Sequence, residues 1–347
     1  MSKKPIGVIG SGSFGTTVAN LLAENSQVLI YARSKELFNQ MKDQRQSRDY
    51  LLHKNVTPIE SLEELASRTE IIFPVVSSSG FRSMMKDLAP YVYPYHTLIH
   101  GTKGLDVTLP EGTSIEDPGI IISRENVKTM SEVILEESAV VKVGCLAGPN
   151  LAREIANNHP AATVVASRFD SVIADGQKLL RNERFQVYGN KDLLGIELTG
   201  VLKNIIAIAA GALSGLGYGE NAKALLVSRG MVEMIYLGKG LGGNTEAFIG
   251  LAGIGDLIAT CSSNLSRNFT LGYRLAQGES FAEITNSMQE VAEGINTVRI
   301  INNFAKFYQF RAPITEKIYQ VLFEELTVQD ALQYLMKIPL NVDIDFL

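Results

Sequence analysis

Three glycines near the start of the chain have a spacing that suits phosphate binding. The segment IGVIGSGSFGTTVANLL, residues 6–22, places Gly10, Gly12 and Gly15 between a short apolar run and a stretch with helical periodicity. In such a unit the first glycine permits a tight turn, the second admits a pyrophosphate, and the third lets helix and strand pack closely. The following helix directs unsatisfied N–H groups at the phosphates. This context favours a dinucleotide site over a purely structural turn.

The end of the next apolar run bears on which dinucleotide is bound. The segment QVLIYAR, residues 27–33, ends in Arg33, and Ser34 and Lys35 precede the first carboxylate, Glu36. An acidic residue at this point binds the ribose 2′-hydroxyl of NAD, whereas an arginine accommodates the 2′-phosphate of NADP. We therefore expect NADP(H) to be preferred and NAD(H) to be a second option. A solvated Arg33, or one stacked on adenine, is the alternative.

Two lysines stand where a plain scaffold does not need them. Lys103, in HGTKGLD, follows an apolar run and should lie at the carboxyl end of a strand, facing the cofactor. The segment ELTGVLKNIIAIAAG places Glu197, Lys203 and Asn204 on an otherwise apolar helix, and Glu197 and Lys203 share no face. A lysine in apolar surroundings needs a partner, and burial favours the neutral amine that can exchange a proton.

A third group of polar residues lies in GLAGIGDLIATCSSNLSRN, residues 250–268. Asp256 follows a glycine-rich turn, and Ser266, Arg267 and Asn268 form a cluster of donors suited to an oxyanion or a phosphate. Each of these residues also has a structural interpretation, since Lys103 and Asp256 could cap helices and Arg267 could be a surface charge.

The elements that must position these residues divide the chain in two. Short apolar runs occur at 6–9, 27–33, 71–76, 97–102, 139–148 and 161–167, and helical segments lie between most of them. This pattern predicts an α/β fold with a Rossmann-like, doubly wound, mostly parallel sheet. From about Leu193 the chain is rich in Ala and Leu without strand-like alternation, which predicts an all-α C-terminal domain. We expect a dinucleotide-binding domain at 1–193 and a helical substrate and catalytic domain at 194–347.

Composition excludes several classes of protein. The 347 residues are too many for one ordinary core, and 46% hydrophobic and 20% charged residues exclude a disordered chain. A net charge of −5 argues against nucleic-acid binding. Cys145 and Cys261 are far apart, which leaves no disulfide framework or CxxC metal site and suits the cytoplasm. The longest apolar tract, 205–216, is shorter than the ~20 residues that cross a bilayer, so we expect no membrane insertion.

Taken together, these segments resemble one enzyme family over most of the chain. The shared segments are GSGSFGT (10–16), TKGLD (102–106), AGPNLAREIA (147–156), ELTGVLKNIIAIAAG (197–211), GLAGIGDLIATC (250–261), SRN (266–268) and VAEGINT (291–297). They resemble the bacterial-type NAD(P)-dependent glycerol-3-phosphate dehydrogenases. The resemblance implies reversible reduction of dihydroxyacetone phosphate to sn-glycerol 3-phosphate, a supply of glycerol phosphate for phospholipid synthesis, and a homodimer.

The resemblance also implies roles for single residues. It implies that the cofactor is lined by Ser13, Phe14, Arg33, Lys103, Ala152, Arg267, Val291 and Glu293. It implies that the substrate is met by Lys103, Gly148, Asn150, Lys203, Asp256, Ser266, Arg267 and Asn268. Lys203 matches the catalytic lysine of the family. Asn150 stands where the family usually has serine, Ser34 weakens the NADP preference, and the stretch 110–137 is longer than usual.

The expected mechanism is hydride transfer to a carbonyl carbon with a proton supplied to its oxygen. We expect Lys203 to donate the proton, Asp256 to orient Lys203, and Lys103 to stabilise the developing alkoxide. The site is expected between the sheet and the helical domain. A 3-hydroxyacid or 6-phosphogluconate dehydrogenase is an alternative, against which the Ser-Arg-Asn trio argues. A nucleotide-binding redox sensor is another, and the lysine at 203 argues against it.

Overall fold

The chain forms two compact units. The computed structural model describes residues 4–117, 119–288 and 292–337. The first unit contains Met1–Asp106 and Thr129–Leu193, and the second contains Val107–Lys128 and Leu194–Leu347. The chain therefore leaves the first unit after Asp106, returns at Thr129, and leaves again after Leu193.

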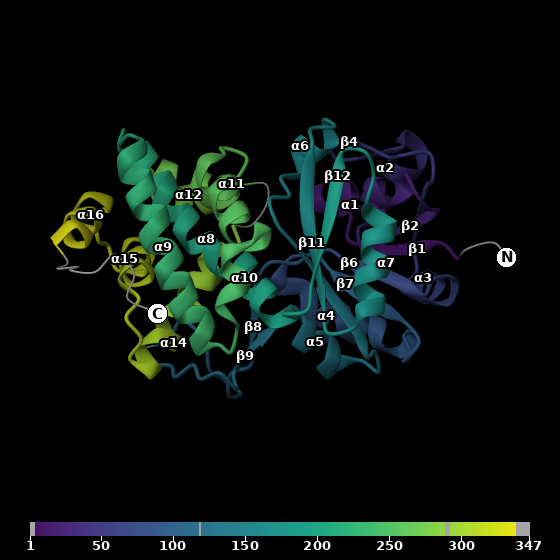
Figure 1. The fold of residues 1–347 in the computed structure, drawn as a ribbon, viewed down its shortest axis with the longest axis horizontal. Coiled ribbons are helices and arrows are strands. Elements are labelled where there is room, and N and C mark those ends of the chain that lie inside the picture. Colours follow the sequence, from purple (N-terminus) through teal and green to yellow (C-terminus); the bar gives the residue numbers. More distant parts are fainter. Residues whose placement is uncertain (1–3, 118, 289–291, 338–347) are drawn as a thin grey trace. The chain divides into compact units, whose positions relative to one another are not determined.

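The first unit is built on an eight-stranded sheet (Figure 1). Its strands are β1 (Ile6–Ile9), β2 (Val28–Tyr31), β5 (Val56–Ile59), β6 (Ile71–Pro74), β7 (Thr97–His100), β10 (Lys142–Ala147), β11 (Ala161–Ser167) and β12 (Phe185–Asn190). Their order is β12-β11-β10-β7-β6-β1-β2-β5, and the six strands from β5 to β10 are parallel. β11 runs antiparallel to β10, with β12 parallel to β11. Two small ladders pair β3 (Gln46–Ser47) with β4 (Tyr50–Leu51), and β8 (Leu105–Val107) with β9 (Val127–Thr129).

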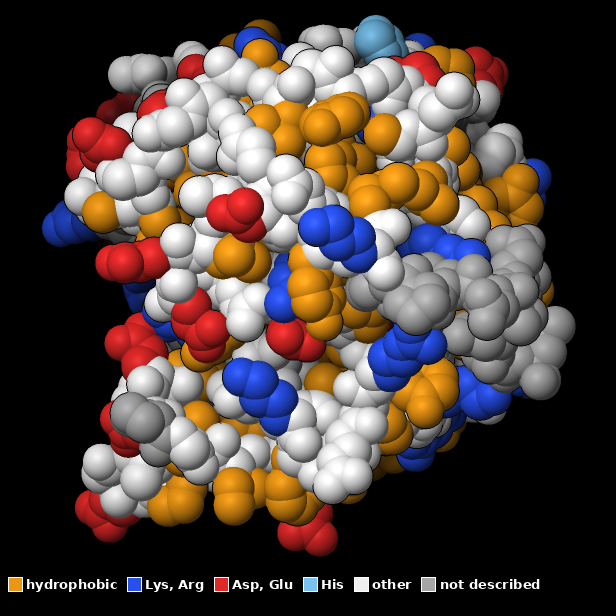
Figure 2. Space-filling model, turned by 90° about the vertical axis from the view of Figure 1, so that its left-hand side faces the viewer, with side chains coloured by type: hydrophobic (Ala, Val, Ile, Leu, Met, Phe, Trp, Pro, Cys, Tyr) orange, Lys and Arg blue, Asp and Glu red, His pale blue; other side chains and the backbone are white. Residues whose placement is uncertain are grey.

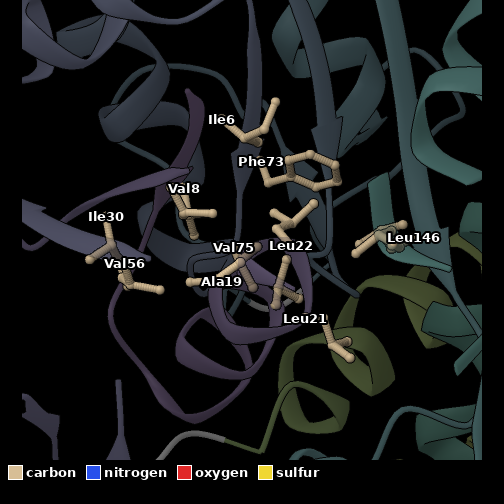
Figure 3. Close-up of a cluster of buried hydrophobic side chains, with 14 of the residues drawn as sticks. Ile6, Val8, Ala19, Leu21, Leu22, Ile30, Val56, Phe73, Val75 and Leu146 are labelled. Atoms are coloured by element: carbon tan, nitrogen blue, oxygen red, sulfur yellow. The ribbon is translucent and has the colours of Figure 1, made fainter. Parts of the chain in front are cut away.

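Helices cover both faces of this sheet, which confirms the doubly wound fold. The helices of the unit are α1 (Ser13–Ala23), α2 (Lys35–Gln44), α3 (Leu62–Arg68), α4 (Ser78–Leu88), α5 (Met130–Glu137), α6 (Ala152–Ala156) and α7 (Asp170–Leu180), with a short 3-10 turn η1 (Ala89–Tyr91). One core cluster joins α1, α2 and α7 to the sheet, and Figure 3 shows Leu22 of α1 near Val8 and Phe73. A second cluster joins α3, α4 and α5 to the opposite face. Alternate strand residues serve the two cores, as a sheet covered on both faces requires.

A guanidinium anchors the chain where it leaves the first unit. Arg82 of α4 donates to the Asp106 carboxylate at 2.9 Å and to Glu136 of α5 at 3.1 Å, and it also pairs with Glu137. Arg82, Asp106 and Glu137 are largely shielded from solvent. Because Asp106 is three residues after Lys103, this cluster fixes the end of the segment that carries Lys103.

In the second unit, the chain after residue 193 is helical, as predicted. Its helices are α8 (Leu193–Gly215), α9 (Glu220–Gly240), α10 (Thr245–Ile249), α11 (Asp256–Ser262), α12 (Arg267–Ala276), α13 (Phe281–Ser287), α14 (Gly294–Tyr308), α15 (Pro313–Phe323) and α16 (Val328–Lys337), with a π-helical turn η2 (Leu251–Gly255). α8 is longer than its apolar tract suggests, and its 23 residues with a mean hydropathy of 1.7 over the most apolar window are enough, by length and composition, to cross a membrane. Inside this fold 94% of that window is buried, so α8 is the core helix of the unit.

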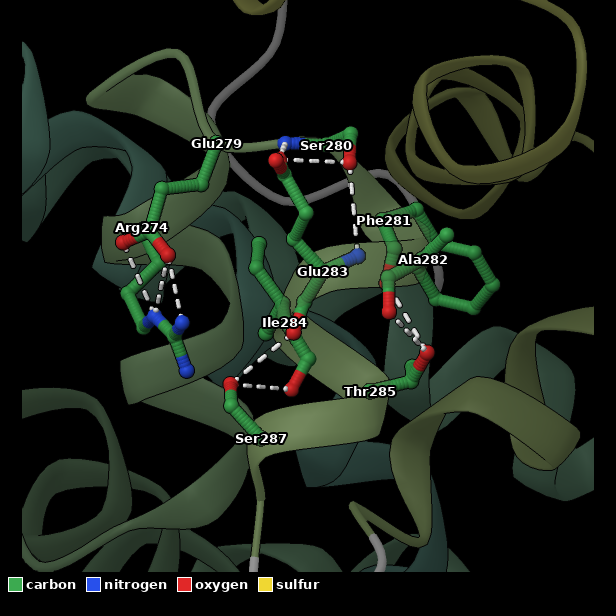
Figure 4. Close-up of polar contacts among 9 residues, drawn as sticks. All are labelled: Arg274, Glu279, Ser280, Phe281, Ala282, Glu283, Ile284, Thr285 and Ser287. Atoms are coloured by element: carbon green, nitrogen blue, oxygen red, sulfur yellow. Dashed lines mark hydrogen bonds and ion pairs between the residues drawn. The ribbon is translucent and has the colours of Figure 1, made fainter.

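The turn between α12 and α13 is held by side chains (Figure 4). The Arg274 guanidinium pairs with Glu279 through Nε at 2.9 Å and also through Nη2. Ser280 and Glu283 form a capping box at the start of α13. The Ser280 hydroxyl and N–H that donate to Glu283 lower the pKa of that carboxyl. These contacts fix the end of α12, whose other end carries Arg267.

The segment 107–128 belongs to the second unit. The domain boundary that we expected from the sequence, at residue 193, had placed this segment in the first domain. Arg124 donates to the Leu241 carbonyl at 2.9 Å, and its N–H donates to the Tyr308 hydroxyl at 3.2 Å. Glu116 forms an ion pair with Arg299 of α14. These contacts join residues more than 100 positions apart, and local sequence patterns do not report such pairings.

Candidate active site and cofactor-binding residues

The glycine turn has the backbone geometry of a phosphate-binding loop. Gly10 lies at a φ of +114°, and a Cβ there would come within 2.2 Å of the Val75 carbonyl oxygen. A Cβ at Gly15 would come within 2.1 Å of the Gly10 carbonyl oxygen. Both positions therefore require glycine, which holds α1 directly behind the end of β1.

The start of α1 fits an anion. The helix begins at Ser13, with Gly12 as its N-cap, and its first turn contains no acidic residue. Among the described residues no side chain caps α1, and the first-turn amide groups of a helix are where anions bind. The sheet order reverses between β1 and β6, where open α/β sheets bind nucleotides. These features fit the pyrophosphate of a dinucleotide.

Other predicted cofactor residues lie on the same edge of the sheet. Arg33 is exposed two residues after the end of β2, and Ser34 caps α2 by accepting from the Leu37 N–H. Half-buried Phe14 lies beside Gly101, where a Cβ would be 3.0 Å from its ring. Ala152 is half-buried in the first turn of α6. At the carboxyl edge of the sheet, Arg33 thus follows a strand, and Phe14 and Ala152 lie in the first turns of helices.

Lys103 and Gly148 meet at the ends of neighbouring parallel strands. The Lys103 ammonium donates to the Gly148 carbonyl at 2.9 Å, so β7 and β10 bring together two predicted substrate positions. Asn150 donates from Nδ2 to the Thr163 hydroxyl at 2.8 Å. Its buried Oδ1 has no hydrogen-bond partner within the described residues. This orientation holds Asn150 toward β11.

Lys203 and Asp256 form a buried ion pair in the second unit. Lys203 of α8 is 4% exposed and Asp256 of α11 is 2% exposed, and the ammonium donates to Asp256 Oδ1. The ammonium also donates to the Thr260 hydroxyl at 2.6 Å, and that hydroxyl donates to the Asp256 carbonyl at 2.6 Å. The carboxylate balances the charge of an ammonium that lies in an apolar core.

The local backbone explains why Asp256 points at the lysine. The π-helical turn η2 immediately precedes it, and a Cβ at Gly253 would come within 1.8 Å of the Phe248 carbonyl oxygen. π-Helical turns are rare and often occur at functional sites. Cys261, one residue beyond Thr260, is buried, and burial raises its pKa to about 12 although Lys203 opposes the shift. Cys261 is therefore a packing residue rather than a nucleophile.

The Ser-Arg-Asn trio forms the beginning of α12. Ser266 is the N-cap, and its hydroxyl accepts from the Phe269 N–H at 3.3 Å. Arg267 is exposed at the first helical position, and the buried Asn268 accepts from the Gly294 N–H at 2.9 Å through Oδ1. This bond leaves the amide group of Asn268 as the donor for a ligand.

Glycine contacts hold α12 against α8. A Cβ at Gly211 of α8 would come within 1.9 Å of the Phe269 carbonyl oxygen, and one at Gly272 of α12 within 1.8 Å of the Ile208 carbonyl oxygen. The two backbones are therefore in direct contact. This contact fixes the helix that carries Lys203 relative to the helix that begins with Arg267.

The predicted residues thus form one group in each unit. The first unit brings together the glycine turn, Lys103, Gly148 and Asn150, and the second brings together Lys203 and Asp256. Glu293 is half-buried directly before α14, whereas Val291 lies outside the described residues. Thr260 was not predicted from the sequence, although its position one helical turn after Asp256 is a usable signal.

A Rossmann-like sheet with a phosphate-binding glycine turn, followed by a helical unit with a buried lysine–aspartate pair, defines a dinucleotide-dependent oxidoreductase. Comparison with known proteins identifies the family of oxidoreductases to which the chain belongs. Residues 5–172 match the family model of the NAD-dependent glycerol-3-phosphate dehydrogenase N-terminus, and residues 192–333 match that of its C-terminus. The chain belongs to the NAD-dependent glycerol-3-phosphate dehydrogenase family, which confirms the resemblance of its motifs.

Relatives and solved structures agree with this assignment. A Pseudomonas putida protein named glycerol-3-phosphate dehydrogenase (NAD(P)+) is 39% identical, over 99% of this chain and 97% of that protein. A Pseudomonas aeruginosa protein of the same name is 37% identical, over 99% and 98%. The crystal structure of glycerol-3-phosphate dehydrogenase from Coxiella burnetii matches with a TM-score of 0.86 and 31% identity, covering 97% of this chain and all of that one.

Proposed function

We propose that this chain reduces dihydroxyacetone phosphate to sn-glycerol 3-phosphate with NAD(P)H, and catalyses the reverse oxidation. The observation that carries the proposal is the buried cluster of Lys203, Asp256 and Thr260. Glycine contacts hold its helix, α8, against α12, whose N-cap and first turn contain Ser266, Arg267 and Asn268. A proton donor and a phosphate-binding helix end are what reduction of a small phosphorylated ketone needs.

The first unit is the proposed cofactor-binding domain. When bound, the reduced nicotinamide supplies a hydride to the carbonyl carbon. The glycine turn and the start of α1 hold the pyrophosphate. Exposed Arg33 binds a 2′-phosphate, which is why we propose a preference for NADP(H) over NAD(H). Ser13, Phe14 and Ala152 complete the proposed contacts in this unit.

The second unit is the proposed substrate and catalytic domain. Lys203 gives a proton to the carbonyl oxygen as negative charge develops there, and accepts the hydroxyl proton in the reverse direction. Asp256 and Thr260 hold its ammonium in one orientation, and Asp256 balances the charge. Lys103, anchored on Gly148, supplies a further positive charge to the alkoxide.

The start of α12 is the proposed phosphate site. Arg267 contributes charge-assisted hydrogen bonds, and Asn268 contributes its free amide donors. Ser266 accepts from the helix backbone through its hydroxyl oxygen, and its hydroxyl hydrogen is the group it offers to a phosphate. Arg267 and Glu293 are also proposed to reach the cofactor, as the family resemblance implies.

A ketone panel tests the proposal. The purified protein is mixed with NADPH, or in parallel with NADH, and loss of reduced-cofactor absorbance is followed with dihydroxyacetone phosphate, dihydroxyacetone, a 3-oxoacid and 3-phosphohydroxypyruvate. We expect turnover with dihydroxyacetone phosphate and at least ~10²-fold less efficient reduction of the unphosphorylated ketones. Turnover of the 3-oxoacid alone would assign a hydroxyacid dehydrogenase, and dinucleotide binding without any turnover would assign a sensor.

We also infer that the enzyme works in the cytoplasm as a homodimer, and feeds phospholipid synthesis. Cys145 and Cys261 are both buried free thiols, which suits a reducing compartment. The dimer and the metabolic role rest on the family resemblance. Light scattering of the purified chain measures the assembly, and a monomer mass at working concentrations would remove the dimer.

A further inference from the structure

A short hairpin outside the main sheet supplies a hydrogen bond to the glycine turn. The hairpin consists of β3 and β4, in which Ser47 pairs with Tyr50. The Ser47 side chain is 1% exposed, and its hydroxyl donates to the Ser11 carbonyl at 2.8 Å. Ser11 lies inside the turn, between Gly10 and Gly12. The hairpin thus fixes one peptide group of the proposed pyrophosphate site.

The hairpin itself is tied to α1, the helix that follows the glycine turn. Asn20 of α1 donates from Nδ2 to the Leu51 carbonyl at 2.8 Å and accepts from the His53 N–H at 2.9 Å. Before the hairpin, Arg45 donates to the His53 carbonyl at 2.6 Å and to the Val56 carbonyl at 2.8 Å. These side-chain bonds hold the hairpin in place beside α1, so the donor that it carries is fixed against the turn.

The backbone on both sides of Ser47 is unusual. Arg45 lies at a φ of +55° and Arg48 at a φ of +51°, in the left-handed region that residues other than glycine seldom adopt. Such conformations cost free energy, and they cluster where a function requires a particular path of the chain. Here they let the chain leave α2, turn within two residues and bring Ser47 to the Ser11 carbonyl.

The bond to Ser47 determines how the peptide group between Ser11 and Gly12 is turned. In a trans peptide the carbonyl and the following N–H point in opposite directions, and no cis peptide bond occurs in the described chain. The Ser11 carbonyl faces the hairpin, so the Gly12 N–H faces away from it. Ser11 and Ser47 are buried, whereas Gly12, the N-cap of α1, is half-buried. The carbonyl is thus the buried, occupied end of this peptide group, and the N–H is its opposite end.

We propose that Ser47 is a positioning residue for the cofactor: by holding the Ser11 carbonyl, it directs the Gly12 N–H to the pyrophosphate of the dinucleotide. This role rests on the proposed function, since it requires a dinucleotide at the glycine turn. A second effect has the same sign, because a carbonyl oxygen that is free to turn toward the pyrophosphate repels its negative charge. Ser47 touches neither cofactor nor substrate and acts only through the peptide group.

Replacement of Ser47 with alanine tests this role in the full chain. Ser47→Ala removes the donor to the Ser11 carbonyl. The affinity for NADPH, followed by the fluorescence of the bound cofactor, should fall ~10-fold or more, since a hydrogen bond to a charged group contributes at least this factor. Displacement of NADPH measures two fragments. The loss should be similar for 2′-phospho-ADP-ribose, which keeps the pyrophosphate, and at most ~2-fold for adenosine 2′-phosphate, which lacks it.

Ser167→Ala is the matched control. Ser167 of β11 is also buried in the first unit, and its hydroxyl donates to the Val143 carbonyl of β10 at 2.6 Å. The variant removes a bond of the same kind and should leave all three dissociation constants unchanged. Equal losses in the two variants, or a Ser47→Ala protein with native affinity for NADPH, would overturn the role. So would a Ser47→Ala protein that loses adenosine 2′-phosphate as strongly as NADPH, because that pattern reports a damaged fold.

Asn20→Ala reaches the same peptide group by a second route. It removes the two side-chain bonds that tie the hairpin to α1, so it should weaken NADPH in the same direction. Because Asn20 acts through Ser47 in this proposal, adding Asn20→Ala to Ser47→Ala should cause little further loss of affinity. Fully additive losses would refute the linkage between the hairpin and the turn.

Salt separates the turn from loose binding of the anionic probes to surface charge. Figure 2 shows Lys and Arg side chains exposed on one face of the molecule, and such charges attract any polyanion at low ionic strength. The ratio of the Ser47→Ala and native dissociation constants for NADPH should be the same at ~0.05 M and ~0.3 M salt. A ratio that disappears at the higher salt would contradict a role at the turn.

Turnover distinguishes this role from the proposed function. With dihydroxyacetone phosphate, Ser47→Ala should raise the KM for NADPH ~10-fold while kcat at saturating NADPH stays within ~2-fold, because no reacting group is changed. A native chain that binds no dinucleotide would overturn both proposals. A native chain that reduces the ketone, beside a Ser47→Ala enzyme with an unchanged KM for NADPH, would overturn only the role of Ser47.

Discussion

Replacing Asp256 with asparagine tests the role of the buried ion pair most directly. Asp256→Asn keeps the shape of the side chain but removes the charge that faces the Lys203 ammonium. Both side chains are almost fully shielded, at 6% and 2% exposed, so water cannot take over the lost interaction. The Thr260 hydroxyl remains as a hydrogen-bond partner but carries no charge.

The size of the effect follows from this burial. Removing one member of a buried ion pair costs ~3 to 5 kcal/mol, because the other charge is left uncompensated. The same reasoning applies to Lys203→Met, which leaves the Asp256 carboxylate without its cation. The double variant has no uncompensated charge. Its cost should therefore fall at least ~2 kcal/mol below the sum of the single costs.

Urea unfolding followed by circular dichroism measures all four proteins, since the chain has no tryptophan to report on folding. Turnover with dihydroxyacetone phosphate is measured in parallel, and we expect Lys203→Met to lose ~10²-fold or more while NADPH still binds. Single variants that each cost under ~1 kcal/mol, with additive effects, would show that the pair is not buried together. A Lys203→Met enzyme that retains most of its turnover would refute the proton-donor role.

Four further predictions test other parts of the site. Arg33→Ala should weaken NADPH far more than NADH, measured as separate dissociation constants, and equal losses would remove Arg33 from the 2′-phosphate. Arg267→Ala should cost ~2 to 5 kcal/mol in kcat/KM for dihydroxyacetone phosphate and much less for dihydroxyacetone, and equal losses at saturating NADPH would place the phosphate elsewhere. Gly211→Ala should force α8 away from α12 and lower kcat/KM while the NADPH dissociation constant is unchanged; an unchanged kcat/KM would refute that role. Burial raises the pKa of Glu233, so above about pH 4.5 the folded state keeps a proton that the unfolded state has released. The free energy of unfolding of the native chain should therefore fall, relative to that of Glu233→Gln, as the pH rises above about 4.5. A difference between the two proteins that does not change with pH would contradict the raised pKa.

The sequence predicted what is decided locally. The strands β1, β2, β6 and β7 could be predicted because runs of branched apolar residues lie between turn signals. The glycine turn could be predicted because each of its glycines is required by the local backbone geometry. The helical second unit followed from its Ala- and Leu-rich composition. The first turn of α1, which begins at Ser13, contains Gly15 and therefore carries little helical pattern of its own.

What the sequence could not predict depends on distant contacts. The segment 107–128 has no helical or strand periodicity, and only pairings such as Glu116 with Arg299 assign it to the second unit. The partners of Lys203 lie more than 50 residues away: Asp256 was singled out by its place after a glycine-rich turn, and Thr260 was left unnoticed.

The core helix of the second unit carries the proposed proton donor, and this placement explains several otherwise separate features. A charge on α8 is tolerable only if its partner comes from another element at contact distance, and the η2 turn brings Asp256 there. The glycine contacts that bring α12 against α8 also set the distance between Lys203 and the proposed phosphate site at the start of α12. The apolar surroundings that make Lys203 unfavourable alone therefore hold it rigidly once Asp256 is in place. Rigid placement of the proposed donor relative to the proposed phosphate site would orient a small ketone for proton transfer.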